Sequence, residues 1–191
     1  VTIKGTEDSL GKTTYGIRQS TEEAKRARIV CSFGGFAAEE IVYGSDQVTS
    51  SCSGDLVSAE QQAEDMISRF GMTRKFRALY LSATTMNRSS NEFRLDIEAE
   101  KTQLLTESYT KALKILTENR DKLDLLVEAL LKHETLTGAQ ARQACLGTLK
   151  MPEPSRTTVE AKSMGSEVKG LLVLGVCCAV HIADAVMSAS R

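Results

Sequence analysis

Apolar residues recur at the spacing of an amphipathic α-helix in four separate stretches, and this periodicity limits the fold more firmly than any other feature of the chain. Only two prolines in 191 residues interrupt such helices, and an aromatic content of 5% favours packing through Leu, Ala, Ile and Met. The sequence therefore predicts a mainly α fold with a short β element before Gly16. The four stretches are 20–43, 56–70, 92–117 and 119–131.

The first of these helices is predicted from its cap and contains two unusual residues. Ser20 followed by Glu23 matches a capping box, which predicts one helix from there to about Tyr43. Gly34 and Gly35 lie inside it, where each costs about 1 kcal/mol relative to Ala. The usual compensation is a backbone that packs closely, so we expect a tight contact at this point.

The remaining segments follow from turn and cap signals. A Ser-rich loop is expected over 44–54, and Gly71 is placed to end the second helix. The stretch 78–81 is compatible with a strand. A second capping box at 137–140 predicts a short helix that ends near Gly147.

Charge and cysteine content exclude several classes of protein. Twenty-four Lys and Arg against 25 Asp and Glu give a net charge of −1, which argues against a basic nucleic-acid binder and an acidic disordered tail. The five cysteines are odd in number, scattered and without a C-x-x-C pair. A disulfide scaffold is therefore not expected, and a reducing compartment is favoured.

A break near 151–155, which contains both prolines, divides the chain. We expect one domain over 1–150, a linker over 151–169 and an apolar tail over 170–191. The run 170–187 is at the lower length limit for a membrane span, and His181 and Asp184 shorten its apolar part. Two alternatives stay open for this run: membrane contact, or a buried helix or strand.

Eight motifs occur in one order with regular gaps, and together they resemble a known family. They are 1–3 (VTI), 33–40 (FGGFAAEE), 53–56 (SGDL), 66–73 (MISRFGMT), 95–98 (LDIE), 109–116 (YTKALKIL), 118–120 (ENR) and 129–136 (ALLKHETL). The set is similar to the peptidase domain of the FtsH family, membrane-bound ATP-dependent zinc metalloproteases, and covers about Val1 to Gly147. The resemblance implies the helical bundle of that domain.

The resemblance also implies a metal ligand. In the FtsH family, both histidines of an H-E-x-x-H helix and a downstream aspartate hold zinc, and the intervening Glu activates the bound water. Asp55 stands at the position of that aspartate, although Gly54 replaces the usual Asn before it and Phe36 replaces the usual Arg after the paired glycines. The H-E-x-x-H motif would precede Val1 and does not occur in these 191 residues. Zinc is therefore expected only if such a motif exists upstream.

Two other groups of metal-binding residue types have simpler explanations. His133, Glu134 and Thr137 match half of an H-E-x-x-H motif, but they fall where a helix ends, and a partly solvated His is the simpler interpretation. The tail contains a second group at helical spacing, in an apolar run where burial is favoured. Its members are Cys177, Cys178, His181 and Asp184.

Two functions follow as hypotheses. The chain is either a fragment of an FtsH-like zinc metallopeptidase, inactive without H-E-x-x-H, or a non-catalytic FtsH-derived structural or assembly subunit of a larger organellar complex. No Walker A pattern is present, so ATP would be handled by another module. The resemblance implies protein partners in a ring or a larger complex and does not imply nucleic acid. It favours a mitochondrial or chloroplast membrane-associated location, with the cytoplasmic face of a bacterial inner membrane as the alternative.

Overall fold

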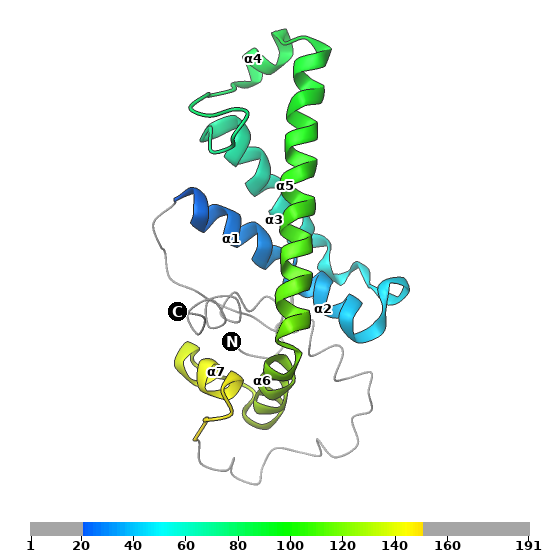
Figure 1. Ribbon diagram of the computed structural model, residues 1–191, viewed down its shortest axis with the longest axis vertical. Helices are drawn as coiled ribbons and strands as arrows, with labels where there is room; N and C mark the ends of the chain where they lie inside the picture. The colour runs from blue at the N-terminus through cyan, green and yellow to red at the C-terminus, as the bar shows by residue number, and fades with distance from the viewer. Residues whose placement is uncertain (1–20, 151–191) are drawn as a thin grey trace. The chain divides into compact units, whose positions relative to one another are not determined.

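The computed structural model describes residues 21–150, and in this part the chain is built from helices with no β-strand (Figure 1). This confirms the mainly α fold class. The β element expected before Gly16, the linker over 151–169 and the tail over 170–191 lie outside the described residues. The α-helices are α1 (Glu22–Ser32), α2 (Gly34–Tyr43), α3 (Ser53–Glu64), α4 (Ala83–Arg88), α5 (Asn91–Glu118), α6 (Arg120–His133) and α7 (Gly138–Cys145).

These helices belong to two compact units. The described parts of the first, here called the α3 unit, are 21–33 and 53–112. The described parts of the second, here called the α6 unit, are 34–52 and 113–150. Helix α5 is continuous and contributes its first 22 residues (91–112) to the α3 unit and its end to the α6 unit.

The helix expected over 20–43 is two helices, and its predicted cap is wrong by one residue. Thr21 is the N-cap of α1, and its hydroxyl accepts the Ala24 N–H at 3.2 Å. The α1 helix ends at Phe33, whose N–H donates to the carbonyls of Ile29 and Val30. Gly34 then begins α2, because a glycine pair disfavours continuation of the first helix.

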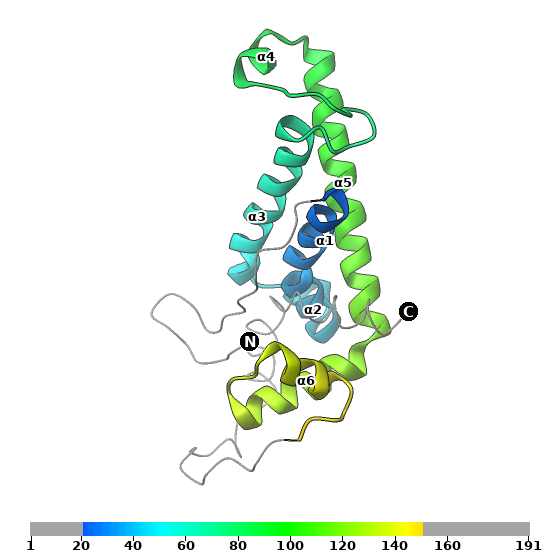
Figure 2. The same cartoon turned by 90° about the vertical axis from the view of Figure 1, so that its left-hand side faces the viewer.

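In the α3 unit, α1 packs against α3, and α3 runs beside the first part of α5 (Figure 2). The α3 face is lined by small side chains, with Ala59 and Ala63 fully buried. Lys101 of α5 lies on the buried face although it is charged, and only 13% of its side chain is exposed. Its Nζ lies 3.0 Å from Glu98, 3.5 Å from Glu60 and 3.7 Å from Glu64.

These three carboxylates explain a charged residue in an otherwise apolar helix stripe. Burial alone would lower the pKa of Lys101, but the hydrogen bond to Glu98 and the charges of Glu98, Glu64 and Glu60 outweigh it. The net result is a pKa above the ordinary value of 10.5. Lys101 therefore remains charged at neutral pH and ties α5 to α3 electrostatically.

Helix α3 continues into a wider turn, η3 (Asp65–Arg69), which is π-helical. The Phe70 N–H donates to the Asp65 carbonyl at 3.0 Å, five residues back, as this geometry requires. Gly71 follows with φ +53°, which confirms it as the residue that ends this helix.

The segment after Gly71 is a turn, so the strand suggested for 78–81 is wrong. Ala78 has φ +57°, a conformation that a strand does not use, and its N–H donates back to the Gly71 carbonyl at 3.0 Å. The apolar side chains of the segment are used for packing instead of pairing: Phe76 and Leu81 join Ile67 and Ile97 in a buried cluster. Phe93 meets Phe76 edge to face with ring centroids 5.6 Å apart.

In the α6 unit, α6 and α7 lie side by side (Figure 1). Asn119 is the N-cap of α6, and Thr137 caps α7 through a complete capping box with Gln140, as predicted. The buried face of the pair consists of Leu123, Leu126, Val127, Leu130, Leu136, Ala141 and Ala144. Asn119 also uses its side chain, whose amide donates to the Ile115 carbonyl at 2.8 Å, so the α5–α6 junction is fixed on both sides.

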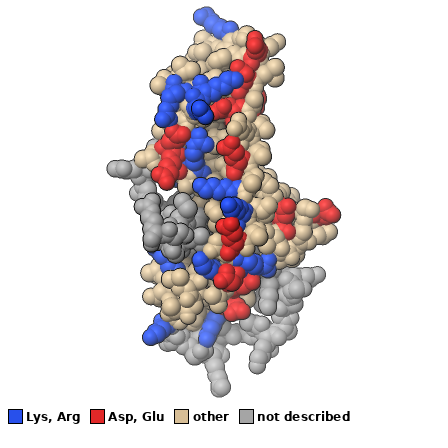
Figure 3. Space-filling view, in the orientation of Figure 1, with Lys and Arg blue, Asp and Glu red and all other residues tan. Residues whose placement is uncertain are grey.

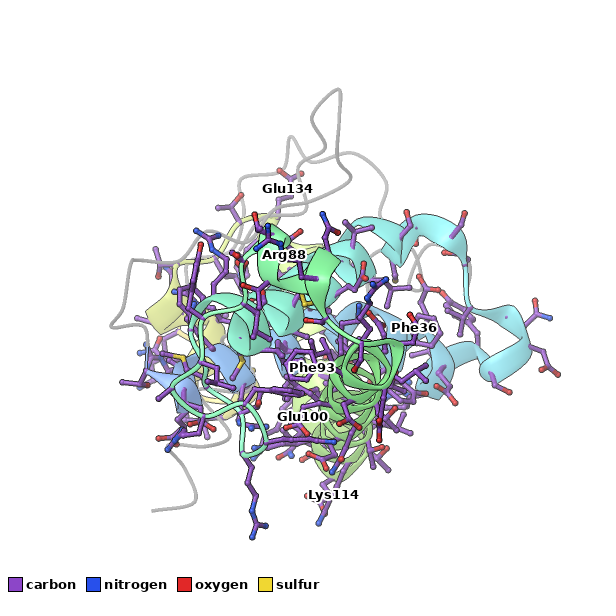
Figure 4. The ribbon with its side chains drawn as sticks, turned by 90° about the horizontal axis from the view of Figure 1, so that it is seen from above. Phe36, Arg88, Phe93, Glu100, Lys114 and Glu134 are labelled. Carbon is purple, nitrogen blue, oxygen red and sulfur yellow. The ribbon has the colours of Figure 1, made fainter. Side chains whose placement is uncertain are left out.

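The surface carries charges of both signs. Lys, Arg, Asp and Glu alternate over the face shown in Figure 3. Lys114, on the end of α5, extends outward in the end-on view of that helix (Figure 4), and its side chain is 72% exposed. Among the helices of residues 21–150, none combines the length and the apolar character that crossing a membrane requires.

Candidate metal centre

Asp55 lies in the first turn of α3, directly after the Ser-rich loop. Its side chain is half-buried, and the backbone N–H groups of a first helical turn favour a negative charge there. A side chain added at Gly54 would have no heavy atom within 4 Å, so the glycine in place of the usual Asn is not required by packing. The structure therefore presents Asp55 as a carboxylate held at a helix N-terminus, a suitable zinc ligand type.

The loop before Asp55 is organised by a residue that the sequence analysis did not single out. Glu39 of α2 is 0% exposed. Its Oε2 accepts the Thr49 N–H at 2.6 Å, and its Oε1 accepts the hydroxyls of Thr49 and Ser51, each at 3.1 Å. The Cys52 thiol lies 3.5 Å from the same Oε1. A sequence signal existed: Glu39 follows Ala37 and Ala38 on a short apolar helix and precedes a loop rich in hydroxyls.

His133 does not form the zinc helix that its spacing to Thr137 suggested. It is the last residue of α6 and is half-buried. Glu134 then leaves the helix with φ +58°, and Thr137 belongs to the cap of the next helix, where it bonds Gln140. The two positions are on different helices, so the interpretation as a chance match is confirmed.

The described residues bring no further metal ligands together. Within 21–150, no group of three or more His, Cys, Asp or Glu side chains is arranged to hold a metal ion. Cys145 is buried in the α6 unit, and burial raises the pKa of its thiol although the charge of Lys122 acts in the opposite direction. The candidate cluster in the tail lies outside the described residues.

Comparison with known proteins identifies the family. The model of peptidase family M41 matches residues 4–144, about three quarters of the chain. The chain belongs to peptidase family M41. The ATP-dependent zinc metalloprotease FtsH of Akkermansia muciniphila is 38% identical over 156 residues, which cover 74% of this chain and 18% of that protein.

Relatives in eukaryotic organelles show the same partial coverage. The mitochondrial inner membrane i-AAA protease supercomplex subunit YME1 of Saccharomyces cerevisiae is 33% identical over 142 residues, 73% of this chain and 19% of YME1. The chloroplastic ATP-dependent zinc metalloprotease FTSH 6 of Arabidopsis thaliana is 32% identical over 127 residues, 61% of this chain and 18% of that protein. The M41 chain thus spans about a fifth of the length of these curated relatives.

The residues of the M41 chain can be compared with what a zinc site needs. Catalytic zinc sites use three protein ligands and keep one position for water or substrate. In the described part, Asp55 is the one residue that matches a family ligand, and no three-residue donor group accompanies it. Residues 21–150 therefore do not make a complete zinc site.

Proposed function

We propose that this chain supplies the helical part of an FtsH-type zinc metallopeptidase domain, with Asp55 as one metal ligand, and that the 191 residues by themselves do not cleave peptide bonds. The M41 match over 4–144 carries the first half of the proposal. The second half rests on the sequence, because its two histidines, His133 and His181, are too far apart to form an H-E-x-x-H motif.

The chemistry of the donors explains why Asp55 alone is insufficient. Zinc needs three or four N, S or O ligands at about 2.0–2.3 Å, and a single carboxylate gives little affinity at neutral pH. Metal analysis of the 191-residue chain purified without chelator should find well under one equivalent of zinc, and a casein assay should detect no cleavage. Stoichiometric zinc that is lost in Asp55→Ala would contradict this proposal.

A fusion protein tests the role of Asp55 directly. The H-E-x-x-H-containing stretch of the Akkermansia FtsH is placed before Val1, and zinc content and casein cleavage are measured for the fusion. We expect about one zinc per chain, with at least a tenfold loss of affinity in Asp55→Asn. Asp46→Asn, which removes an exposed carboxylate from the preceding loop, is the matched control and should leave zinc binding unchanged. Equal zinc affinity in the Asp55 and Asp46 variants would refute the ligand role.

A non-catalytic assembly role is the second candidate, and exposed apolar side chains in the α3 unit favour it. Val57 is 66% exposed, Tyr80 71% and Leu95 70%. Such side chains suit contact with another protein, and the relative YME1 is named as a subunit of a supercomplex. A fusion that binds zinc but cleaves nothing, together with light scattering that shows association of the 191-residue chain, would favour this role.

The proposed setting follows the relatives. Their names place them in the mitochondrial inner membrane and the chloroplast, and we propose an organellar membrane-associated location, with a bacterial membrane as the alternative. We propose protein partners in a ring or a larger complex. Membrane contact through 170–187 belongs to the same proposal, and flotation of the chain with liposomes tests it against a variant truncated after residue 169.

A further inference from the structure

Glu39 is a fully buried carboxylate that serves the loop beside it. Three consecutive helical residues, Ala37, Ala38 and Glu39, are 0% exposed. The two alanines are ordinary core residues, but an ionised carboxylate is costly to bury unless donors satisfy it. The partners that satisfy Glu39 all come from the loop, since the described residues form no ion pair with it.

The four donors are of different kinds and converge on one side chain. A backbone N–H, two hydroxyls and a thiol from Thr49, Ser51 and Cys52 face the two oxygens of Glu39. The hydroxyls of Thr49 and Ser51 also lie 2.6 Å from each other, so the loop is bonded to itself as well as to the helix. Hydrogen bonds to a charged group contribute about 1.5–3 kcal/mol each, which exceeds the contribution of neutral pairs.

The loop needs such contacts because it has little packing of its own. Among residues 44–51 none is buried, and two short turns, η1 (Ser45–Gln47) and η2 (Ser50–Cys52), are its regular structure. Fixing each residue costs about 1–2 kcal/mol of conformational entropy. Glu39 offers the buried polar anchor against which this exposed loop is ordered.

The anchored residues lead directly into α3. Cys52 is 4% exposed, it is the last residue of η2, and Ser53 is the first residue of α3. Asp55 follows two residues later in the same first turn. The anchor therefore acts on the stretch of backbone that determines where α3 begins and how its first turn is presented.

We propose that Glu39 is a positioning residue for Asp55: its carboxylate fixes the 49–52 backbone and so the first turn of α3 that carries the metal ligand. The proposal rests on the proposed function of Asp55 as a zinc ligand. Glu39 itself touches no substrate or metal in this scheme; it acts through Thr49, Ser51 and Cys52.

The test uses the 191-residue chain and requires no metal. Glu39→Gln keeps the size of the side chain but removes the negative charge and one acceptor. Amide hydrogen exchange should become about tenfold faster or more at Thr49 and the following loop amides, since a charge-assisted bond is weakened. In protein labelled with ¹³C at Asp carboxyls, the Asp55 signal should shift or broaden. Asp46→Asn is the control and should change neither measurement.

The Asp55 signal separates positioning from general stabilisation. A merely structural Glu39 would lower the melting temperature of the variant but leave the Asp55 signal of the folded chain unchanged, and that result would overturn the proposal. If Glu39→Gln does not fold, Thr49→Val is used instead; it removes one hydroxyl donor, and an unchanged Asp55 signal in that variant would overturn the proposal equally. Because no zinc is involved, this failure is distinct from a failure of Asp55 to bind zinc in the fusion.

Discussion

Replacement of Gly71 by alanine should be among the most damaging single-methyl additions in this chain. Gly71 has φ +53°, and a left-handed conformation costs an alanine about 1–2 kcal/mol relative to glycine. Its added Cβ would lie 2.6 Å from the Leu79 nitrogen, 2.8 Å from the Ala78 nitrogen and 2.8 Å from the Leu79 oxygen. These are backbone atoms, so relief requires the 78–79 turn to move.

The magnitude follows from adding the two effects. Overpacking against a well-fitted neighbour costs about 1–3 kcal/mol. Together with the left-handed term, Gly71→Ala should lower the free energy of unfolding by about 2–5 kcal/mol. Movement of the turn also threatens the 3.0 Å bond from the Ala78 N–H to the Gly71 carbonyl, so the loss should fall in the upper half of this range.

Two other glycines supply matched controls for urea unfolding followed by circular dichroism at 222 nm. Gly147 has φ +65° but no heavy atom within 4 Å of an added Cβ, so Gly147→Ala should show the left-handed cost alone, about 1–2 kcal/mol. Gly54 is helical with equally open space, and Gly54→Ala should be neutral or stabilise by up to about 1 kcal/mol. If Gly71→Ala costs no more than Gly147→Ala, the close approach of the 78–79 backbone is refuted.

Three further substitutions or reactions test other parts of the structure. Lys101→Met should lose about 1 kcal/mol at pH 7 and low salt, where its exposed Glu partners limit the gain; because the folded pKa of Lys101 is raised, the loss should shrink as the pH rises above 10.5, as urea unfolding at several pH values can show. Cys145 is buried with a raised pKa, so it should react with iodoacetamide at pH 8 at least tenfold more slowly than a free thiol, and mass spectrometry that finds it labelled at the free-thiol rate would contradict its burial. Gly35 is buried in α2, and Gly35→Leu should cost about 1–3 kcal/mol by overpacking, whereas an unchanged melting temperature would show that space exists there.

Periodicity and caps were sufficient to predict most of the helices. The long helix expected over 92–117 is α5 (Asn91–Glu118), and the capping box at Thr137 is present as expected. These features are local: an apolar stripe or a hydroxyl three residues from an amide carries its structural meaning in the sequence itself.

The errors occur where distant residues decide the outcome. The 78–81 stretch has the composition of a strand, but no partner strand is present in the described residues, and Leu81 is used to fill a cluster with Ile67 and Ile97. The break at Phe33 was missed because a glycine pair is compatible with a kink, a close contact or a new helix. At the candidate site, Asp55 came from family resemblance, whereas Glu39 depends on a loop ten residues away folding back over it.

The π-helical turn at the end of α3 has a consequence for how M41 sequences change in length. A wider turn holds one residue more than an α-helical turn would, and here it keeps three successive side chains, Met66, Ile67 and Ser68, on the buried side. Loss of one residue in this turn can be absorbed by rewinding it to an α-helix while Ser53 and Gly71 remain the two ends. Single-residue gaps among homologues should therefore collect between residues 64 and 71, and the segments on either side should align without gaps.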